Sequence, residues 1–375
     1  MSEEERAAVG FFEPAIEVAT GITRFFWSSS PFLAVMFLFL AGCKDSGVGP
    51  IIQTTQSYYL YAANYSFDQV FVIDTSNNAI VDTLHGFGSV WDITATRSGR
   101  KLYVTTRQGP VNWPGAVYSV DPVTKSKRQI LAKAADIYLE PWGVPLIVIS
   151  TPYDSMRQLG TIDTLTDAIS IFDTLNILDS GHNYEALVFD PKSTILYTWT
   201  NHGRLFSYDY GTKRIGRYYN SVGFPLLNMA ISTDGRHIYF ANGPVLDVTR
   251  DSVVDEIPAY NESTLGSLAL SPDGQYLYLT DPGKPLLPEP VPSGKIRVFQ
   301  TNTNSPIGFI DVNEAAGQAN TMTDRMIIGS NGRKAYVSGG FSDVFEIDLE
   351  SNQVIGIVKF GESNMWIQSL ALALR

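Results

Sequence analysis

The chain has 375 residues, of which 44% are apolar and 17% charged, so its composition is that of an ordinary globular protein and not of a disordered one. Its net charge of −11 and its lack of a basic run argue against a nucleic-acid partner, because phosphate contacts dominate that affinity. Cys43 is the single cysteine, so the chain forms no internal disulfide.

The N-terminal part of the chain reads as an export signal. The apolar run 32–42 is too short to span a bilayer as a helix, but it suits the core of a signal peptide. Leu40-Ala-Gly-Cys43 resembles the bacterial lipobox, which implies that Cys43 is acylated and becomes the mature N-terminus. We therefore expect a lipoprotein signal peptide over 1–42, a flexible tether over 43–57 and a lipid-anchored protein in the cell envelope, periplasmic or on the surface. An ordinary secretory signal with an incidental cysteine is the alternative.

The rest of the chain repeats one strand. The copies recur every 39 to 58 residues and begin at Leu60, Leu102, Leu146, Leu196, Ile238, Leu277 and Ala335. A period near 40 residues made of strands and turns is typical of a β-propeller, with one blade per repeat. We expect an all-β, seven-bladed propeller over 58–375, present as a monomer.

Each repeat divides into four strands, most clearly in residues 266–310. The innermost strand is predicted over 266–270, the second over 275–280, the third over 295–300 and the outer one over 306–310. Aspartates such as Asp74 and Asp121 end the third strands, and we interpret them as turn caps rather than as functional groups. The tyrosine of each second strand is expected to pack between blades.

The pattern Leu-Tyr-Val-Thr, followed by Val-x-Val-Ile-Asp-Thr, resembles the YVTN-repeat propellers, and Tyr103-Val-Thr-Thr106 is its closest match. The resemblance implies an extracytoplasmic seven-bladed propeller, and it carries no shared catalytic residues. The chain ends with Gln368–Leu372, which aligns with the innermost strands. We expect this last strand to complete the first blade and close the ring.

The two faces of such a ring differ. Turns after the first and third strands lie on one face, here called the first face, and are short. Loops after the second and fourth strands lie on the other, the second face, and hold nearly all the length variation. Because long loops on a rigid scaffold usually carry binding residues, we expect the second face to be functional. Its candidate loop residues are Trp91, Trp113, His182 and Tyr184.

Polar residues at the start of the innermost strands are expected to line the mouth of the central channel. They are Asp92, Asp136, Glu185, Asn228, Asp324 and Arg325. Oxygen ligands of this kind suit calcium, and Asp92, Glu185 and Asn228 are the candidate set. The simpler interpretation is a water-filled channel that tolerates polar side chains.

Two function classes remain. The first is a binding or scaffold module that presents its second face to a protein, glycan or small ligand, with no cofactor. The second is a metal-assisted hydrolase, similar to a lactonase, with its site at the channel mouth. The lack of a catalytic motif favours binding.

Overall fold

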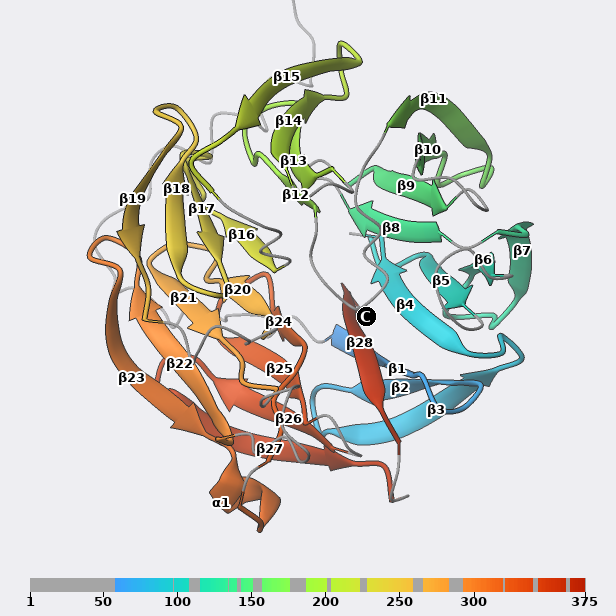
Figure 1. Ribbon diagram of the computed structural model, residues 1–375. Helices are drawn as coiled ribbons and strands as arrows, with labels where there is room; N and C mark the ends of the chain where they lie inside the picture. The colour runs from blue at the N-terminus through green and yellow to red at the C-terminus, as the bar shows by residue number, and fades with distance from the viewer. Residues whose placement is uncertain are drawn as a thin grey trace, which may run out of the picture. The chain divides into compact units, whose positions relative to one another are not determined.

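The computed structural model describes residues 58–96, 98–107, 115–133, 135–139, 143–150, 157–175, 187–200, 204–222, 228–258, 266–282, 293–319, 321–339, 343–361 and 365–374. These residues form seven four-stranded antiparallel sheets arranged as the blades of one ring (Figure 1). The expected all-β, seven-bladed propeller is confirmed. The predictions for residues 1–57, including the acylation of Cys43, lie outside the described residues.

The blades follow the chain in order. Blade 1 contains β28 (Ile367–Leu374), β1 (Tyr58–Asn64), β2 (Gln69–Asp74) and β3 (Ala79–His85). Blade 2 contains β4 (Val90–Ala95), β5 (Leu102–Arg107), β6 (Gly115–Val120) and β7 (Lys127–Leu131). Blade 3 contains β8 (Ala135–Leu139), β9 (Pro145–Ser150), β10 (Arg157–Ile162) and β11 (Ile169–Leu175). Blade 4 contains β12 (Leu187–Phe189), β13 (Ile195–Trp199), β14 (Leu205–Asp209) and β15 (Arg214–Tyr219).

The remaining blades have the same order of strands from the centre outward. Blade 5 contains β16 (Met229–Ile231), β17 (His237–Phe240), β18 (Pro244–Asp247) and β19 (Ser252–Glu256). Blade 6 contains β20 (Leu268–Leu270), β21 (Tyr276–Leu279), β22 (Lys295–Gln300) and β23 (Ser305–Asp311). Blade 7 contains β24 (Met326–Ile328), β25 (Lys334–Ser338), β26 (Asp343–Asp348) and β27 (Gln353–Lys359).

The C-terminal strand closes the ring. β28 pairs antiparallel with β1, from Tyr58 opposite Leu374 to Asn64 opposite Ile367. The innermost strand of blade 1 therefore comes from the opposite end of the chain to its other three strands, as the sequence predicts. The pairing with β28 covers the inner edge of β1, which would otherwise be left without hydrogen-bond partners.

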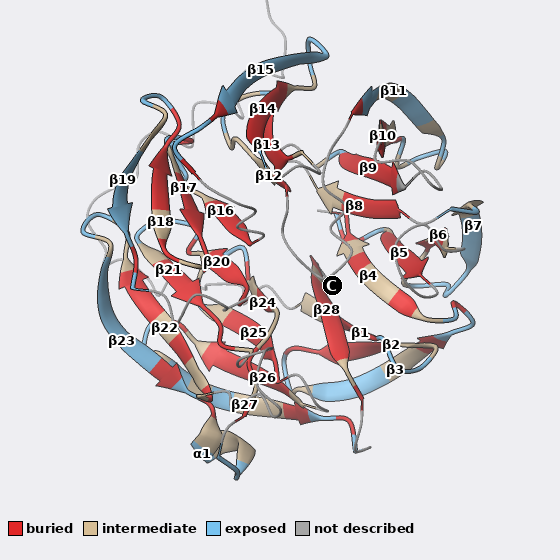
Figure 2. Cartoon of the chain, viewed as in Figure 1, coloured by how far each residue is buried: buried red, intermediate tan, exposed pale blue. Residues whose placement is uncertain are grey.

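The core lies between the blades. Figure 2 shows buried residues in the inner three strands of each blade and exposed residues along most of the outer strands. The second-strand tyrosines Tyr61, Tyr103, Tyr197, Tyr239, Tyr278 and Tyr336 are at most 4% exposed. Burial raises the pKa of Tyr239 to about 12. The predicted role of these rings in inter-blade packing is confirmed: Tyr61, for example, packs with Val90 and Leu102 of the next blade.

The turns between third and outer strands share one backbone conformation. Each contains one residue with positive φ, namely Asn78, Lys125, Asp167, Lys213, Asp251, Asn304 and Asn352. Four residues before it, an aspartate caps the turn in every blade except blade 6, where Gln300 takes this place. In blade 2, Asp121 accepts hydrogen bonds from the backbone N–H groups of Val123 and Thr124 at 2.8 and 2.9 Å. The interpretation of these aspartates as caps is confirmed.

Blade 3 differs from the sequence alignment by one residue. Leu102 of blade 2 pairs with Val120, directly before the capping Asp121. Leu146 pairs instead with Thr161, two residues before the capping Asp163. The repeat in this blade therefore begins at Pro145 and not at Leu146.

In the described part of the chain, one short helix interrupts the β structure. α1 (Asn313–Ala316) follows β23 and ends at Gly317, which has a φ of 70°. Within the described part of the chain, no helix combines the length and apolarity needed to cross a bilayer.

Candidate functional site

Four of the predicted mouth residues, Asp92, Asp136, Asn228 and Arg325, occupy one level of the ring. Asp92 pairs with Thr105 and Asp136 with Val148, each the fourth residue of its blade's second-strand repeat. Asn228, Ser267, Arg325 and Ser369 continue the same register in blades 5, 6, 7 and 1. The innermost strands of these six blades therefore carry equivalent residues at this level.

Arg107 and Asp136 form a buried ion pair between blades 2 and 3. The Nη2 atom of Arg107, at the end of β5, lies 2.8 Å from each carboxylate oxygen of Asp136 in β8. The two side chains are 6% and 8% exposed. A buried ion pair stabilises a fold only when its geometry is good, and loss of one partner leaves an uncompensated charge.

Trp91 completes this group from β4. The guanidinium carbon of Arg107 lies 4.7 Å from the centre of the Trp91 ring. Tyr65, in the turn after β1, contacts the same indole edge-on, with the ring centres 6.0 Å apart. Because the cation is fixed by Asp136, it also fixes the plane of the indole. Trp91 is therefore a rigid, partly exposed aromatic group at the inner end of the second face.

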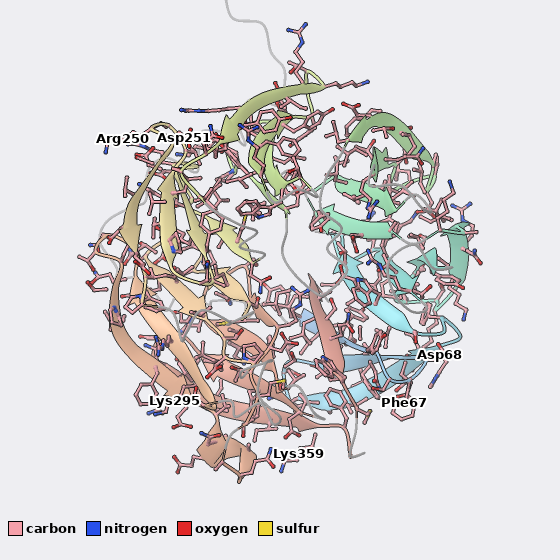
Figure 3. The ribbon with its side chains drawn as sticks, viewed as in Figure 1. Phe67, Asp68, Arg250, Asp251, Lys295 and Lys359 are labelled. Atoms are coloured by element: carbon pink, nitrogen blue, oxygen red, sulfur yellow. The ribbon has the colours of Figure 1, made fainter. Side chains whose placement is uncertain are left out.

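Asp68 positions the strand that carries Trp91. Its carboxylate accepts hydrogen bonds from the backbone N–H groups of Gly86, Phe87 and Gly88, in the connection from blade 1 to blade 2. Gly86 and Gly88 have positive φ, so three successive N–H groups converge on one anion. Figure 3 shows Phe67 and Asp68 as neighbours beside blade 1. The connection that leads into β4 is thus fastened at the second face.

Asp92 and Asn228 also bind neighbouring blades. The Ser369 hydroxyl donates to Asp92 Oδ1, and the Ile93 backbone N–H donates to Ser369 Oγ at 3.3 Å, so blades 1 and 2 are joined where the ring closes. The Asn228 amide donates to the carbonyl of Gly266 in blade 6 at 2.7 Å. Several polar side chains at this level of the ring therefore form hydrogen bonds between neighbouring blades.

Asp324 and Arg325 lie at the start of the innermost strand of blade 7. The Asp324 carbonyl accepts a hydrogen bond from Thr280 of blade 6 at 2.7 Å. Burial raises the pKa of the Asp324 carboxyl, against the opposing effects of the Arg325 charge and a hydrogen bond with Trp366. Asp324, at the start of the innermost strand of blade 7, therefore also contacts blade 6 through Thr280 and blade 1 through Trp366, directly before β28.

The remaining predicted residues lie outside the described residues. These are Glu185, Trp113, His182 and Tyr184. Among the described residues, no three His, Cys, Asp or Glu side chains form a group suited to a metal ion. Asp92 and Asn228 belong to blades 2 and 5, and the calcium set that joins them to Glu185 stays a prediction.

Arg107 is the residue that the sequence reasoning missed. It directly follows the fifth residue of its repeat, at a position where the other blades have no residue type in common. Carrying the alignment one residue further places Arg107 beside the mouth level, which was the available signal.

Comparisons with known proteins agree on the architecture. The structure is similar to a functionally unknown protein from Desulfotomaculum acetoxidans, with a TM-score of 0.61 and 13% identity over 84% of this chain and 99% of that one. It is also similar to hydrazine synthase of Kuenenia stuttgartiensis, with a TM-score of 0.53 and 15% identity over 70% of this chain and 77% of that one. A third similar structure is dihydro-haem d1 dehydrogenase in complex with DHE, with a TM-score of 0.54 and 13% identity over 81% of this chain and 64% of that one.

No family model and no curated protein sequence matches the chain. The similar structures have low sequence identity, so they support the propeller fold alone. Propellers host many unrelated functions, and the function has to be argued from the site.

Proposed function

We propose that the chain is a lipid-anchored, extracytoplasmic binding module that holds a protein, glycan or small ligand on its second face. The observation that carries the proposal is the fixed Arg107–Trp91 stack. Tryptophan, tyrosine and arginine dominate the energy of binding surfaces when they are rigid and well packed. Here the ion pair with Asp136 holds the indole, and Tyr65, 36% exposed, extends the aromatic surface outward.

A binding site whose side chains are already fixed loses less conformational entropy on binding than a site on flexible side chains. An aromatic group that is already fixed loses little conformational freedom when a ligand covers it. Asp68 and Asp136 fix its two supports, the connection before β4 and the cation above the ring. The arrangement therefore suits recognition, and its hydrogen-bonded carboxylates are engaged in holding the blades together.

Site-directed photo-cross-linking in the membranes of the producing cell tests the binding face. Benzoylphenylalanine replaces Tyr65 on the second face or, as the control, Asn302 in a first-face turn. We expect one saturable adduct from position 65 only, and we expect Trp91→Ala to abolish it. Equal labelling from both positions, or an adduct indifferent to Trp91→Ala, would show that this face is not the binding surface.

Membrane fractionation tests the anchor. Cys43→Ser removes the only thiol that a lipid could modify, whereas Ser46→Ala leaves it in place. We expect the Cys43→Ser protein to leave the membrane fraction and the Ser46→Ala protein to stay. A Cys43→Ser protein that remains with the membrane, together with a parent protein that carries no acyl mass shift, refutes acylation.

A further inference from the structure

The tips of two neighbouring first-face turns carry exposed apolar side chains. Val123, in the turn between β6 and β7, is 85% exposed, and Leu165, between β10 and β11, is 90% exposed. Among the described residues, the next most exposed large apolar side chain is Phe309, at 53%. Side chains this exposed gain nothing from packing within the fold.

The apolar tips are confined to blades 2 and 3. Both residues stand two positions after the aspartate that caps the turn. The equivalent positions of the other five blades hold Ser76, Gly211, Thr249, Asn302 and Glu350. The turn conformation therefore does not require an apolar residue here, since the same fold is made with polar ones or glycine.

One basic residue joins the two tips, and two more lie in the neighbouring turns. Arg128 of β7 donates to the carbonyl of Thr166, directly after Leu165, at 2.7 Å, and its side chain is 62% exposed. Lys125, two residues after Val123, is 55% exposed. Arg100, in the first-face turn between β4 and β5, is also exposed. The hairpins that bear the two tips are neighbours at the right of Figure 1.

Charge sets blade 2 apart from the rest of the chain. Residues 90–133 contain eight Lys and Arg but only two Asp, in a protein with a net charge of −11. Three of the cations form ion pairs with adjacent blades. Lys101 and Arg128 both bind Asp167 of blade 3, and Lys125 binds Asp82 of blade 1. Lys101 and Arg128 together carry one more charge than Asp167, whereas the carboxylates of Asp121 and Asp163 accept hydrogen bonds from the backbone N–H groups of their own turns.

We propose that the first face of blades 2 and 3 docks on an anionic lipid bilayer, with Val123 and Leu165 inserted among the headgroups. Protruding apolar side chains beside lysine and arginine match the interface of such a bilayer, where the acyl boundary lies beneath a negative surface. Two convex tips suit a soft surface better than the complementary pocket of a protein. This docking leaves the second face turned away from the membrane.

The inference does not depend on what the second face binds. Two apolar side chains give weak binding by themselves, and stable attachment usually needs a second signal. The tips therefore set the orientation of a chain brought to the membrane by other means. An absence of adducts at Tyr65 would overturn the proposed binding function and leave this docking surface intact.

Fluorescence quenching by brominated lipids tests the docking surface on the full chain. Val123→Trp and Leu165→Trp place reporters at the two tips, and Asn302→Trp is the matched control at the same turn position of blade 6. Each variant is mixed at low salt with vesicles of brominated phosphatidylglycerol and phosphatidylcholine, or of phosphatidylcholine alone. Flotation of the protein is measured in the same samples.

We expect the added fluorescence at positions 123 and 165 to be quenched on anionic vesicles, with no quenching at position 302. High salt or phosphatidylcholine alone should reduce the quenching, because charge attraction is screened or removed. Equal quenching at all three positions, or none at any, would overturn the proposal. In a Cys43→Ser chain, which lacks the proposed acyl anchor, Val123→Ser with Leu165→Ser should lower the floated fraction at low salt, whereas Ile307→Ser with Val253→Ser, exposed on outer strands, should not.

Discussion

The carboxylate of Asp167, in the turn between β10 and β11, binds the ammonium group of Lys101 in the neighbouring blade at 2.6 Å. Arg128 donates to the other oxygen at 2.7 Å, and the Tyr103 hydroxyl lies 3.3 Å from the first. Asp167 has a φ of 61°, and its side chain is 8% exposed. The left-handed residue of a tight turn is thus also a link between two blades.

The same turn position links other blades. In each case the residue with positive φ contacts the preceding blade around the ring, which for blade 1 is blade 7. The pairs are Asn78 with Glu346, Lys125 with Asp82, Lys213 with Phe172, Asp251 with Arg217 and Asn304 with Asp255. The turns of the first face therefore form a series of inter-blade contacts, which explains why they are short and regular.

Replacing Asp167 with asparagine should destabilise the ring. Asparagine tolerates the left-handed backbone, so the change isolates the charge. Its partners are partly exposed, which lowers the expected loss to about 1–3 kcal/mol in the free energy of unfolding. Urea denaturation measures it.

Asp251→Asn is the matched control, because Asp251 occupies the same turn position but its pair with Arg217 is longer, at 3.6 Å. We expect a smaller loss there. A loss as large as that of Asp167→Asn would mean that the turn, and not the carboxylate cluster, is responsible.

The capping aspartates predict an acid-sensitive stability. Hydrogen bonds from Thr194 and Thr212 hold the pKa of the Asp209 carboxyl below its usual value. A lowered folded-state pKa gives stability that is present above the unfolded pKa and is lost as pH falls through the folded one. Because the Asp209 carboxylate caps its turn through the backbone N–H groups of Gly211 and Thr212, and because it is screened by solvent, Asp209→Ala should cost about 1 kcal/mol near neutral pH.

The pH dependence distinguishes charge from shape. The difference in unfolding free energy between parent and Asp209→Ala should shrink once the pH falls below about 4, near the ordinary aspartate pKa. Thermal or urea unfolding across an acid pH series measures it. A difference that stays constant into strong acid would contradict the assignment.

The fold was predictable because its evidence is repeated. The tyrosine of each second strand and the aspartate after each third strand occur in most blades, so errors in one copy are corrected by the others. In blade 3 this correction fails. Leu146 has the residue type expected at the first position of the repeat, but Pro145 occupies that position in the strand register. Side-chain identity could not settle a shift of one residue, because neighbouring positions of a buried strand are all apolar.

The site was less predictable because its contacts join different blades. Asp136 was predicted from its place at the start of an innermost strand, but its partner Arg107 stands at the end of a strand in another blade. The positive charge of blade 2 was also missed, because its basic residues alternate with strand residues over 90–133 and form no continuous basic run. Neither property repeats from blade to blade.

The buried Arg107–Asp136 pair predicts strong non-additivity. Arg107→Met or Asp136→Leu alone should each cost about 3 kcal/mol or more, because each leaves a buried charge without its partner. The double variant should lose much less than the sum. Urea denaturation of the four proteins measures the coupling, and additive losses would show that the two side chains do not depend on each other.

Ring closure predicts that the last strand is indispensable. Deleting residues 368–375 removes nearly all of β28, including the buried Leu370 and Ala371, and exposes β1. We expect a thermal transition that is far lower and less cooperative than in the parent. Deletion of Arg375 alone is the control, and a truncated protein that melts like the parent would refute closure by this strand.

Hydrogen exchange of the full chain, compared between its native membranes and the purified state, tests the central claim that the second face is the binding face. The account predicts slower exchange in native membranes in residues 65–68 and 88–92, around Tyr65 and Trp91, with no change in the turn 300–304 on the first face. Unchanged exchange around Trp91, with protection confined to first-face turns, would contradict it.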